Sequence, residues 1–181
     1  MPEEEKTIKD FEQLTGLLKK KEICKRTVVV WPEENHTQEA ILQAEHEGFI
    51  SAILVCSERT KKIFADREGL QAVTAENPEE ASRIAVKIIR EQKADIIMKG
   101  FVNTDVLLRA ILDKEHGILP RGAVLTHITV TKIPEYPKLL FFTDAAVIPY
   151  PTEEQRKAQI KYVIDFCHAF NIDCPKISLI H

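Results

Sequence analysis

The feature that most constrains this chain is the repeated alternation of short β-branched runs with longer helical segments. Residues 27–32 (TVVVWP) and 49–57 (FISAILVCS) are apolar enough to be buried strands. The segment between them, residues 36–48, has apolar residues at helical spacing and ends at a glycine. Because parallel strands need a crossover connection, this alternation predicts a three-layer α/β fold with a mainly parallel sheet.

The alternation continues along the whole chain. Periodicity and capping residues predict the helices, and apolar runs bounded by turn-forming residues predict the strands. The further helices are expected at residues 7–20, 60–65, 77–92, 103–117 and 152–170, and the further strands at residues 70–75, 94–100, 124–133, 138–143 and 176–181.

The last of these strands has no helix after it, although parallel strands are normally covered by helices. We therefore expect the chain to be an N-terminal fragment of a longer protein. Residues 1–148 are expected to form a first α/β domain, and residues 149–181 are expected to begin a second one. The prolines at 149 and 151 would stiffen the connection between the two domains.

Composition and charge argue against several classes of protein. The 181 residues carry 25 basic and 28 acidic side chains, a formal net charge of −3, so no basic excess indicates a nucleic-acid partner. No apolar run is long enough to cross a membrane, and the acidic start does not resemble a signal peptide. The four cysteines form no CxxC pair, and no Cys/His cluster is present. We expect a cytoplasmic protein with free thiols, no membrane partner and no metal.

Polar residues lie at or near the ends of three of the predicted strands. They are Lys99 and Gly100, Thr126 and His127, and Thr143 and Asp144. Ligands of α/β sheets bind beyond the carboxyl ends of the strands. The sequence therefore predicts that these side chains line one shared cleft.

Three long blocks of sequence occur in the order and spacing of a known family. They are ADIIMKGFVNTDVLLRAILDKEHGI, LTHITVTKIPEYPKLLFFTDAA and EEQRKAQIKYVIDFCHAFNIDCPKISLI. These blocks resemble the phosphate acetyl/butyryltransferases, and most closely the phosphate butyryltransferase branch. The resemblance extends from about Thr27 to His181 and is densest from Ala94 onward.

The resemblance implies a reversible transfer of a short acyl group between coenzyme A and phosphate. Acyl-CoA, phosphate and acyl phosphate are then the partners, with coenzyme A as a substrate and no permanently bound cofactor. It also implies a fold similar to the isocitrate and isopropylmalate dehydrogenases, with two α/β domains beside a cleft, and a homo-oligomer. The family's Ser-Arg-x-x-Asp-like segment, which binds phosphate and helps to activate the thiol, would lie beyond His181, so the catalytic residues are expected outside this chain.

The first group of candidate site residues surrounds the start of a helix. Lys99, Gly100 and Thr104 are expected to hold phosphate or the pyrophosphate of coenzyme A, because a helix N-terminus offers free N–H groups to an anion. The alternative is a surface lysine beside an ordinary helix cap. Arg121 lies in the loop HGILPRGAVLTH, where butyryltransferases tend to have Gly-Leu-Arg, and whether it has the same role is left open.

The second group lies in the two later strands. Thr126 and His127 resemble the strand that faces acyl phosphate in relatives, and both can donate hydrogen bonds to phosphate or carbonyl oxygens. The alternative for His127 is a packed core histidine. Thr143 and Asp144 match the family's loop between domains, where the carboxylate would orient a cation or bind a substrate hydroxyl. The alternative for Asp144 is an Asx turn that leads into the prolines.

Two other functions are considered beside acyl transfer. One is a hydroxy-acid dehydrogenase-like enzyme of the same fold, which would need a nicotinamide site and metal-binding aspartates, and neither is visible in the sequence. The other is a truncated, catalytically inactive module that still binds an anion or coenzyme A.

Overall fold

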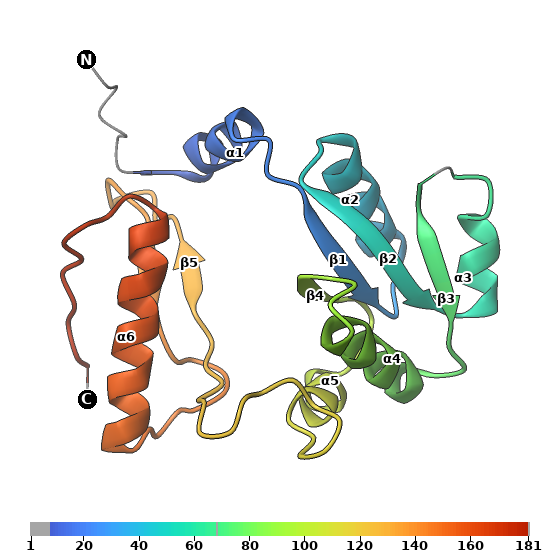
Figure 1. The fold of residues 1–181 in the computed structure, drawn as a ribbon. Helices are drawn as coiled ribbons and strands as arrows, with labels where there is room; N and C mark the ends of the chain where they lie inside the picture. The colour runs from blue at the N-terminus through green and yellow to red at the C-terminus, as the bar shows by residue number, and fades with distance from the viewer. Residues whose placement is uncertain (1–7, 68, 181) are drawn as a thin grey trace. The chain divides into compact units, whose positions relative to one another are not determined.

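The computed structural model describes residues 8–67 and 69–180, which form two compact units (Figure 1). We call Leu18–Pro120 the sheet unit. The second unit combines the residues up to Leu17 with those from Arg121 onward, and we call it the hairpin unit. Each unit is described by itself below.

A four-stranded parallel sheet is the centre of the sheet unit. Its strands are β1 (Lys25–Val30), β2 (Ile50–Cys56), β3 (Gln71–Thr74) and β4 (Ile96–Lys99), in the order β3-β2-β1-β4. β1 pairs with β2 on one side, and with β4 on the other from Thr27↔Ile96 to Val30↔Lys99. The predicted α/β fold with a mainly parallel sheet is therefore confirmed.

Helices cover both faces of this sheet. α2 (Asn35–His46) and α3 (Glu58–Ile63) lie on one face, and α4 (Pro78–Arg90) and α5 (Thr104–Ile111) lie on the other. Successive side chains of β1 alternate between the faces, as strand geometry requires. Val28 and Val30 belong to the core beneath α4 and α5, whereas Val29 belongs to the core beneath α2 and α3.

Two of the four helices that lie within the sheet unit, α3 and α4, start at a side-chain cap, whereas α2 and α5 have none. The Ser57 hydroxyl accepts a hydrogen bond from the Thr60 N–H at 3.2 Å, and the Asn77 side chain accepts one from the Glu80 N–H at 2.9 Å. Both are side-chain caps of the kind that stabilise a first helical turn. α4 also has a proline at its first position, where the missing N–H costs no hydrogen bond.

α5 ends at Ile111, whereas the helix was expected to continue to residue 117. Asp113 Oδ1 accepts hydrogen bonds from the N–H groups of Glu115 at 2.9 Å and His116 at 2.6 Å. This local bonding competes with a continued helix. At Gly117 a side chain would collide with the carbonyl oxygens of Ile111 and Asp113, so the closing turn requires glycine.

The hairpin unit contains a two-stranded antiparallel sheet, β5 (Thr129–Thr131) and β6 (Leu140–Phe142), and the long helix α6 (Glu153–Ala169). α1 (Phe11–Lys20) runs across the division between the units. The core of the hairpin unit joins Phe141 of β6 to two rings at the end of α6. The Phe141 ring lies 6.1 Å from Phe166 and 5.2 Å from Phe170, both edge to face, a favourable arrangement of aromatic rings.

The strands expected at residues 124–133 and 138–143 are shorter than predicted, and they pair antiparallel with each other. The first begins only at Thr129 because the N–H of His127 donates to a carboxylate and not to a strand neighbour. The prediction of a strand at residues 176–181 is wrong for residues 176–180, because they pair with none of the described strands. His181 lies outside the described residues.

The two units divide the chain differently from the expected domains, residues 1–148 and 149–181. Residues of the hairpin share a core with the end of α6, so the segment from Arg121 to residue 148 groups with the later helix. As an assignment of domains in the whole protein, the expectation stays a prediction. In the part of the chain that the structure describes, no helix is both long enough and apolar enough to cross a lipid bilayer.

Candidate functional site

The strand order of the sheet unit places a topological switch point between β1 and β4. From β1 the chain moves outward in one direction through β2 and β3, and then returns to add β4 on the other side of β1. Ligands of open α/β sheets bind at such a point, beyond the carboxyl ends of the two strands. Lys99 is the last residue of β4, so the predicted Lys99–Gly100 pair lies at this edge.

The ammonium group of Lys99 bends back over the loop that follows β4. Its Nζ donates to the carbonyl oxygen of Val102 at 2.9 Å and to that of Gly100 at 3.3 Å. A lysine has three donors, and the structure shows no third acceptor for this group among the described residues. The exposed Lys99 can therefore stabilise its own loop and still donate one hydrogen bond to an anion.

Gly100 is packed against the main chain at the end of β1. In the structure a Cβ at this position would lie 2.6 Å from the carbonyl oxygen of Val30 and 2.8 Å from that of Trp31. The N–H of Gly100 also donates a hydrogen bond to the carbonyl oxygen of Val30 at 2.9 Å. Gly100 thus fits the loop tightly against the end of β1.

The N-terminus of α5 has no side-chain cap. Asn103 is the N-cap residue, but its side chain makes no capping hydrogen bond, and Thr104 is the exposed first residue of the helix. α3, α4 and α6, in contrast, are each capped by a side chain. The first N–H groups of α5 therefore have no side-chain acceptor, which is compatible with the anion seat expected at Lys99, Gly100 and Thr104.

In the hairpin unit, the Asp144 carboxylate is the centre of a polar cluster. Its Oδ2 accepts from the Thr126 hydroxyl at 2.6 Å and from the His127 N–H at 3.0 Å. Its Oδ1 accepts from the N–H groups of Ala146 at 2.9 Å and Val147 at 2.8 Å. The last two bonds are those of an Asx turn, so the alternative considered for Asp144 describes part of what it does.

These bonds hold Asp144 in its charged form. Partial burial by itself would raise the pKa of the carboxyl. The hydrogen bonds from the Thr126 hydroxyl and from the N–H groups of Val147, Ala146 and His127 outweigh burial and hold the pKa well below its usual range. Asp144 is therefore an acceptor at neutral pH.

The Thr126 hydroxyl is fully used inside this cluster. Its single proton goes to Asp144, so the contact with the Thr143 hydroxyl at 3.1 Å must use the Thr143 proton. Thr126 also accepts from Nε2 of Gln159 at 3.3 Å. The expected donation from Thr126 to phosphate is therefore not available in this arrangement, because the proton already has an acceptor.

Sequence analysis missed Gln159, which is only 4 % exposed. A signal was present, because Gln159 occupies the same helical face as Val163, Phe166 and Phe170, at intervals of four, three and four residues. A polar residue in an apolar stripe usually has a buried hydrogen-bond partner. Here that partner is Thr126.

The remaining predicted residues of the hairpin unit are exposed. Nδ1 of His127 lies 3.3 Å from the Thr129 hydroxyl, and its imidazole is on the surface, so the alternative of a packed core histidine is wrong. Arg121 is the first residue of this segment of the unit and is also exposed.

The structure thus brings the predicted site residues together in two groups. Lys99, Gly100 and Thr104 lie around the loop after β4 in the sheet unit. The residues in the hairpin unit are Arg121, Thr126, His127, Thr143 and Asp144. Whether both groups face one cleft stays a prediction. Within residues 8–67 and 69–180, no three His, Cys, Asp or Glu side chains are placed to hold a metal ion.

The fold and the loop after β4 define a parallel α/β protein with an edge suited to an anionic ligand. Residues 68–181 match the family described as phosphate acetyl/butaryl transferase. The match covers more than half of the chain, and the chain belongs to this family.

Relatives from several bacteria agree with this membership. The chain is 33% identical to a phosphate butyryltransferase of Clostridium beijerinckii over 94% of this chain and 57% of that protein. It is 31% identical to a probable phosphate butyryltransferase of Bacillus subtilis over 85% of this chain and 52% of that protein. A phosphate acetyltransferase of Thermotoga maritima is 26% identical over 86% of this chain and 54% of that protein. The chain spans about half the length of these curated relatives.

A solved structure shows the same fold. It is a branched-chain phosphotransacylase from Enterococcus faecalis, with a TM-score of 0.67 and 18% sequence identity. The similarity covers 80% of this chain and 51% of that chain.

Proposed function

We propose that the protein that carries this chain transfers a short acyl group between coenzyme A and phosphate. The observation that carries the proposal is the family match over residues 68–181. The relatives named as butyryltransferases are 33% and 31% identical to the chain, and the Thermotoga acetyltransferase is 26% identical. We therefore propose butyryl-CoA as the substrate to test first. The same relatives favour acyl transfer over the dehydrogenase alternative.

The chemistry of this reaction requires groups that bind and stabilise negative charge. A phosphate oxygen attacks the thioester carbonyl, and a C–O bond forms as the carbonyl becomes a tetrahedral oxyanion. The C–S bond then breaks, and coenzyme A leaves as a thiolate that takes up a proton. Positioned phosphate and a stabilised oxyanion are therefore the two main requirements for catalysis.

The loop after β4 is suited to the first requirement. In our proposal, Lys99 directs its third N–H to phosphate or to the pyrophosphate of coenzyme A, and the uncapped start of α5 at Thr104 adds backbone donors. Gly100 keeps this loop in place against β1. Arg121, whose guanidinium is exposed, is proposed as a further anion-binding group.

In the hairpin unit we propose a division of roles. His127 is exposed and can donate to a phosphate or carbonyl oxygen through its imidazole. Thr126, Thr143 and Asp144 hold the loops next to it. The hydroxyl protons of Thr126 and Thr143 are already donated within the cluster, and the Asp144 carboxylate accepts there. This assigns positioning, and not direct contact with substrate, to Thr126.

The proposal extends to the whole protein. The chain spans about half the length of these relatives, and we propose that the groups that activate the thiol belong to the part of the family pattern that this chain does not cover. We also propose a two-domain fold of the isocitrate and isopropylmalate dehydrogenase kind, in which both groups of residues face one cleft. A cytoplasmic homo-oligomer without a permanently bound cofactor completes the proposal.

Phosphate-dependent release of thiol from butyryl-CoA tests this function. We expect coenzyme A to appear only when phosphate is added, together with an equal amount of butyryl phosphate, and acetyl-CoA to serve as the comparison substrate. The absence of phosphate-dependent thiol release from both thioesters would contradict the proposal. Detectable oxidation of a hydroxy acid with NAD would favour the dehydrogenase alternative.

A further inference from the structure

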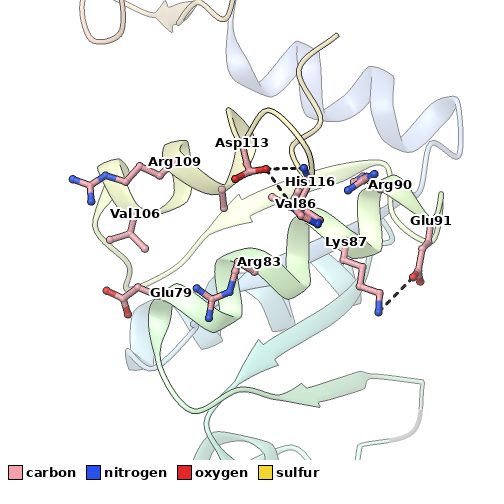
Figure 2. A pocket seen from close by; sticks show the side chains of 11 residues that line it. Glu79, Arg83, Val86, Lys87, Arg90, Glu91, Val106, Arg109, Asp113 and His116 are labelled. Carbon is pink, nitrogen blue, oxygen red and sulfur yellow. Dashed lines mark hydrogen bonds and ion pairs between the residues drawn. The ribbon is translucent and has the colours of Figure 1, made fainter. Parts of the chain in front are cut away.

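A groove of about 840 Å³ lies between α4 and α5 in the sheet unit (Figure 2). Its floor is apolar and consists of Val86 from α4, which is 2% exposed, and the partly buried Val106 and Ala110 from α5. None of the residues assigned above to acyl transfer lines it. The groove is therefore a separate surface that needs its own explanation.

One side of the groove is a row of cations on α4. Arg83, Lys87 and Arg90 line it and are all exposed. They are spaced four and three residues apart, so they lie on the same side of the helix. With a rise of about 1.5 Å per residue, the first and last of them are about 10 Å apart along the helix axis.

The charges in the groove are not balanced. Arg83 and Arg90 form no ion pair with a described residue. Glu91 lies 2.7 Å from the Lys93 ammonium and 3.9 Å from that of Lys87, as Figure 2 shows for the second pair, and Asp113 accepts from the His116 N–H. The hydrogen bond with Lys93 lowers the pKa of Glu91. Glu79, the third acidic residue of the lining, forms no ion pair with a described residue. Two arginines and one glutamate of the lining are therefore left without an ion pair, so the unpaired charge is mainly positive.

We propose that this groove binds an acidic amphipathic α-helix of a partner protein. The apolar side of that helix would lie on Val86, Val106 and Ala110. Because all α-helices have the same rise per residue, carboxylates spaced four and three residues apart would meet Arg83, Lys87 and Arg90 one by one. Arginine suits this role, since its planar guanidinium binds a carboxylate through two hydrogen bonds.

The length of the groove favours a helix over a small anion. The lining residues run from Glu79 in α4 to Glu91, the residue directly after this helix, about 18 Å along the helix axis. A second copy of this chain does not supply the required helix. Among the helices that the structure describes, none has three acidic residues at intervals of four and three. We commit to a helix of a different protein as the occupant, and this proposal is independent of the acyl-transfer reaction.

A designed peptide tests the groove directly. The probe is a labelled amphipathic helix with glutamates at i, i+4 and i+7 beside leucines, and its control is a scrambled peptide of the same composition. Fluorescence anisotropy should show binding of the probe and at least tenfold weaker binding of the scrambled peptide. The double variant Arg83→Glu/Arg90→Glu should weaken binding of the probe at least tenfold, and a peptide with lysines in place of its glutamates should restore it.

A matched variant controls for net charge. Arg59→Glu/Lys62→Glu changes two exposed cations of α3, on the other face of the sheet, and should leave binding unchanged. Circular dichroism checks that both double variants fold. Equal binding of probe and scrambled peptide, or no effect of Arg83→Glu/Arg90→Glu, overturns the proposal. Displacement of the probe by coenzyme A or phosphate at micromolar concentration overturns it in favour of a small-anion site, and a change in oligomer mass caused by the Arg83/Arg90 variant overturns it in favour of a second copy.

Discussion

The Thr126 hydroxyl lies 2.6 Å from Oδ2 of Asp144, a residue 18 positions later in the sequence. This short, charge-assisted hydrogen bond joins the segment before β5 to the loop after β6. Both segments carry residues that we assign to the candidate site. The geometry of that site therefore depends on a bond between two side chains that need not touch the substrate.

Replacing Thr126 by valine tests this bond. Thr126→Val keeps the side-chain volume but removes the proton donated to Asp144 and the acceptor used by Gln159 and Thr143. Leaving such groups without partners costs about 1–3 kcal/mol. We expect the free energy of unfolding to fall by this amount, as measured by chemical denaturation. Thr126→Ser retains the hydroxyl and should lose less than half as much, and equal losses for both variants would contradict the role of the bond.

The pH dependence of stability should reveal Asp144. Its pKa is lower in the folded protein than in the unfolded chain, so its contribution is fully present above about pH 4, the ordinary pKa of an aspartate, and is lost as the pH falls toward the folded pKa. The Asp144→Asn variant has no carboxylate at this position, so it has no such contribution to lose. Its free energy of unfolding should fall less steeply than that of the wild type between about pH 5 and pH 2, in denaturation curves recorded at a series of pH values. Parallel slopes would show that Asp144 has an ordinary pKa.

Lys99 provides a kinetic test of the proposed anion site. In the whole protein, Lys99→Ala should raise the apparent KM for phosphate or for coenzyme A about tenfold or more. The substitution removes a charged ammonium group that donates hydrogen bonds beside the uncapped start of α5. Steady-state kinetics with each substrate varied in turn measures this effect. Lys93→Ala is a suitable control, since Lys93 is an exposed lysine whose ammonium pairs with Glu91. Unchanged KM and kcat in Lys99→Ala would remove Lys99 from the site.

Gly100 and Gly16 form a matched pair for a test of stability. At Gly100 a methyl group would meet the carbonyl oxygens of Val30 and Trp31 below 3.0 Å, and main-chain atoms cannot rotate away. We expect Gly100→Ala to destabilise the protein by about 1–3 kcal/mol. At Gly16, within α1, a methyl group meets no atom within 4 Å, so Gly16→Ala should stabilise by about 0.5–1 kcal/mol. Thermal unfolding of both variants checks the two signs.

The sheet unit could be predicted well from the sequence because its signals are local. β-branched residues indicate β1, and Asn77 caps α4 at the start of the helix expected at residues 77–92. Gly48 closes α2 with a positive φ of 78°, as its position in the sequence suggested. Each of these features is decided by residues that are close together in the chain.

The hairpin unit was harder to predict because its structure depends on distant partners. The apolar run at Leu140–Phe142 has the same appearance whether its neighbour is parallel or antiparallel, and the antiparallel pairing with Thr129–Thr131 is not encoded locally. Gln159 and Thr126 are 33 residues apart, so their contact has no signature at either position. The sequence indicated which residues could bind an anion. Which of them donate hydrogen bonds and which accept them could be seen only in the structure.

The contact of Gly100 with the end of β1 has a further consequence for protein engineering. The loop that follows Lys99 is located by main-chain atoms at the end of the neighbouring strand β1, whose side chains do not take part in that contact. Substitutions elsewhere in the loop can therefore change which ligand it prefers, but they cannot move the ammonium group along the sheet. A redesign that needs Lys99 in a different place would have to shift β1, which is one of the two inner strands of the parallel sheet.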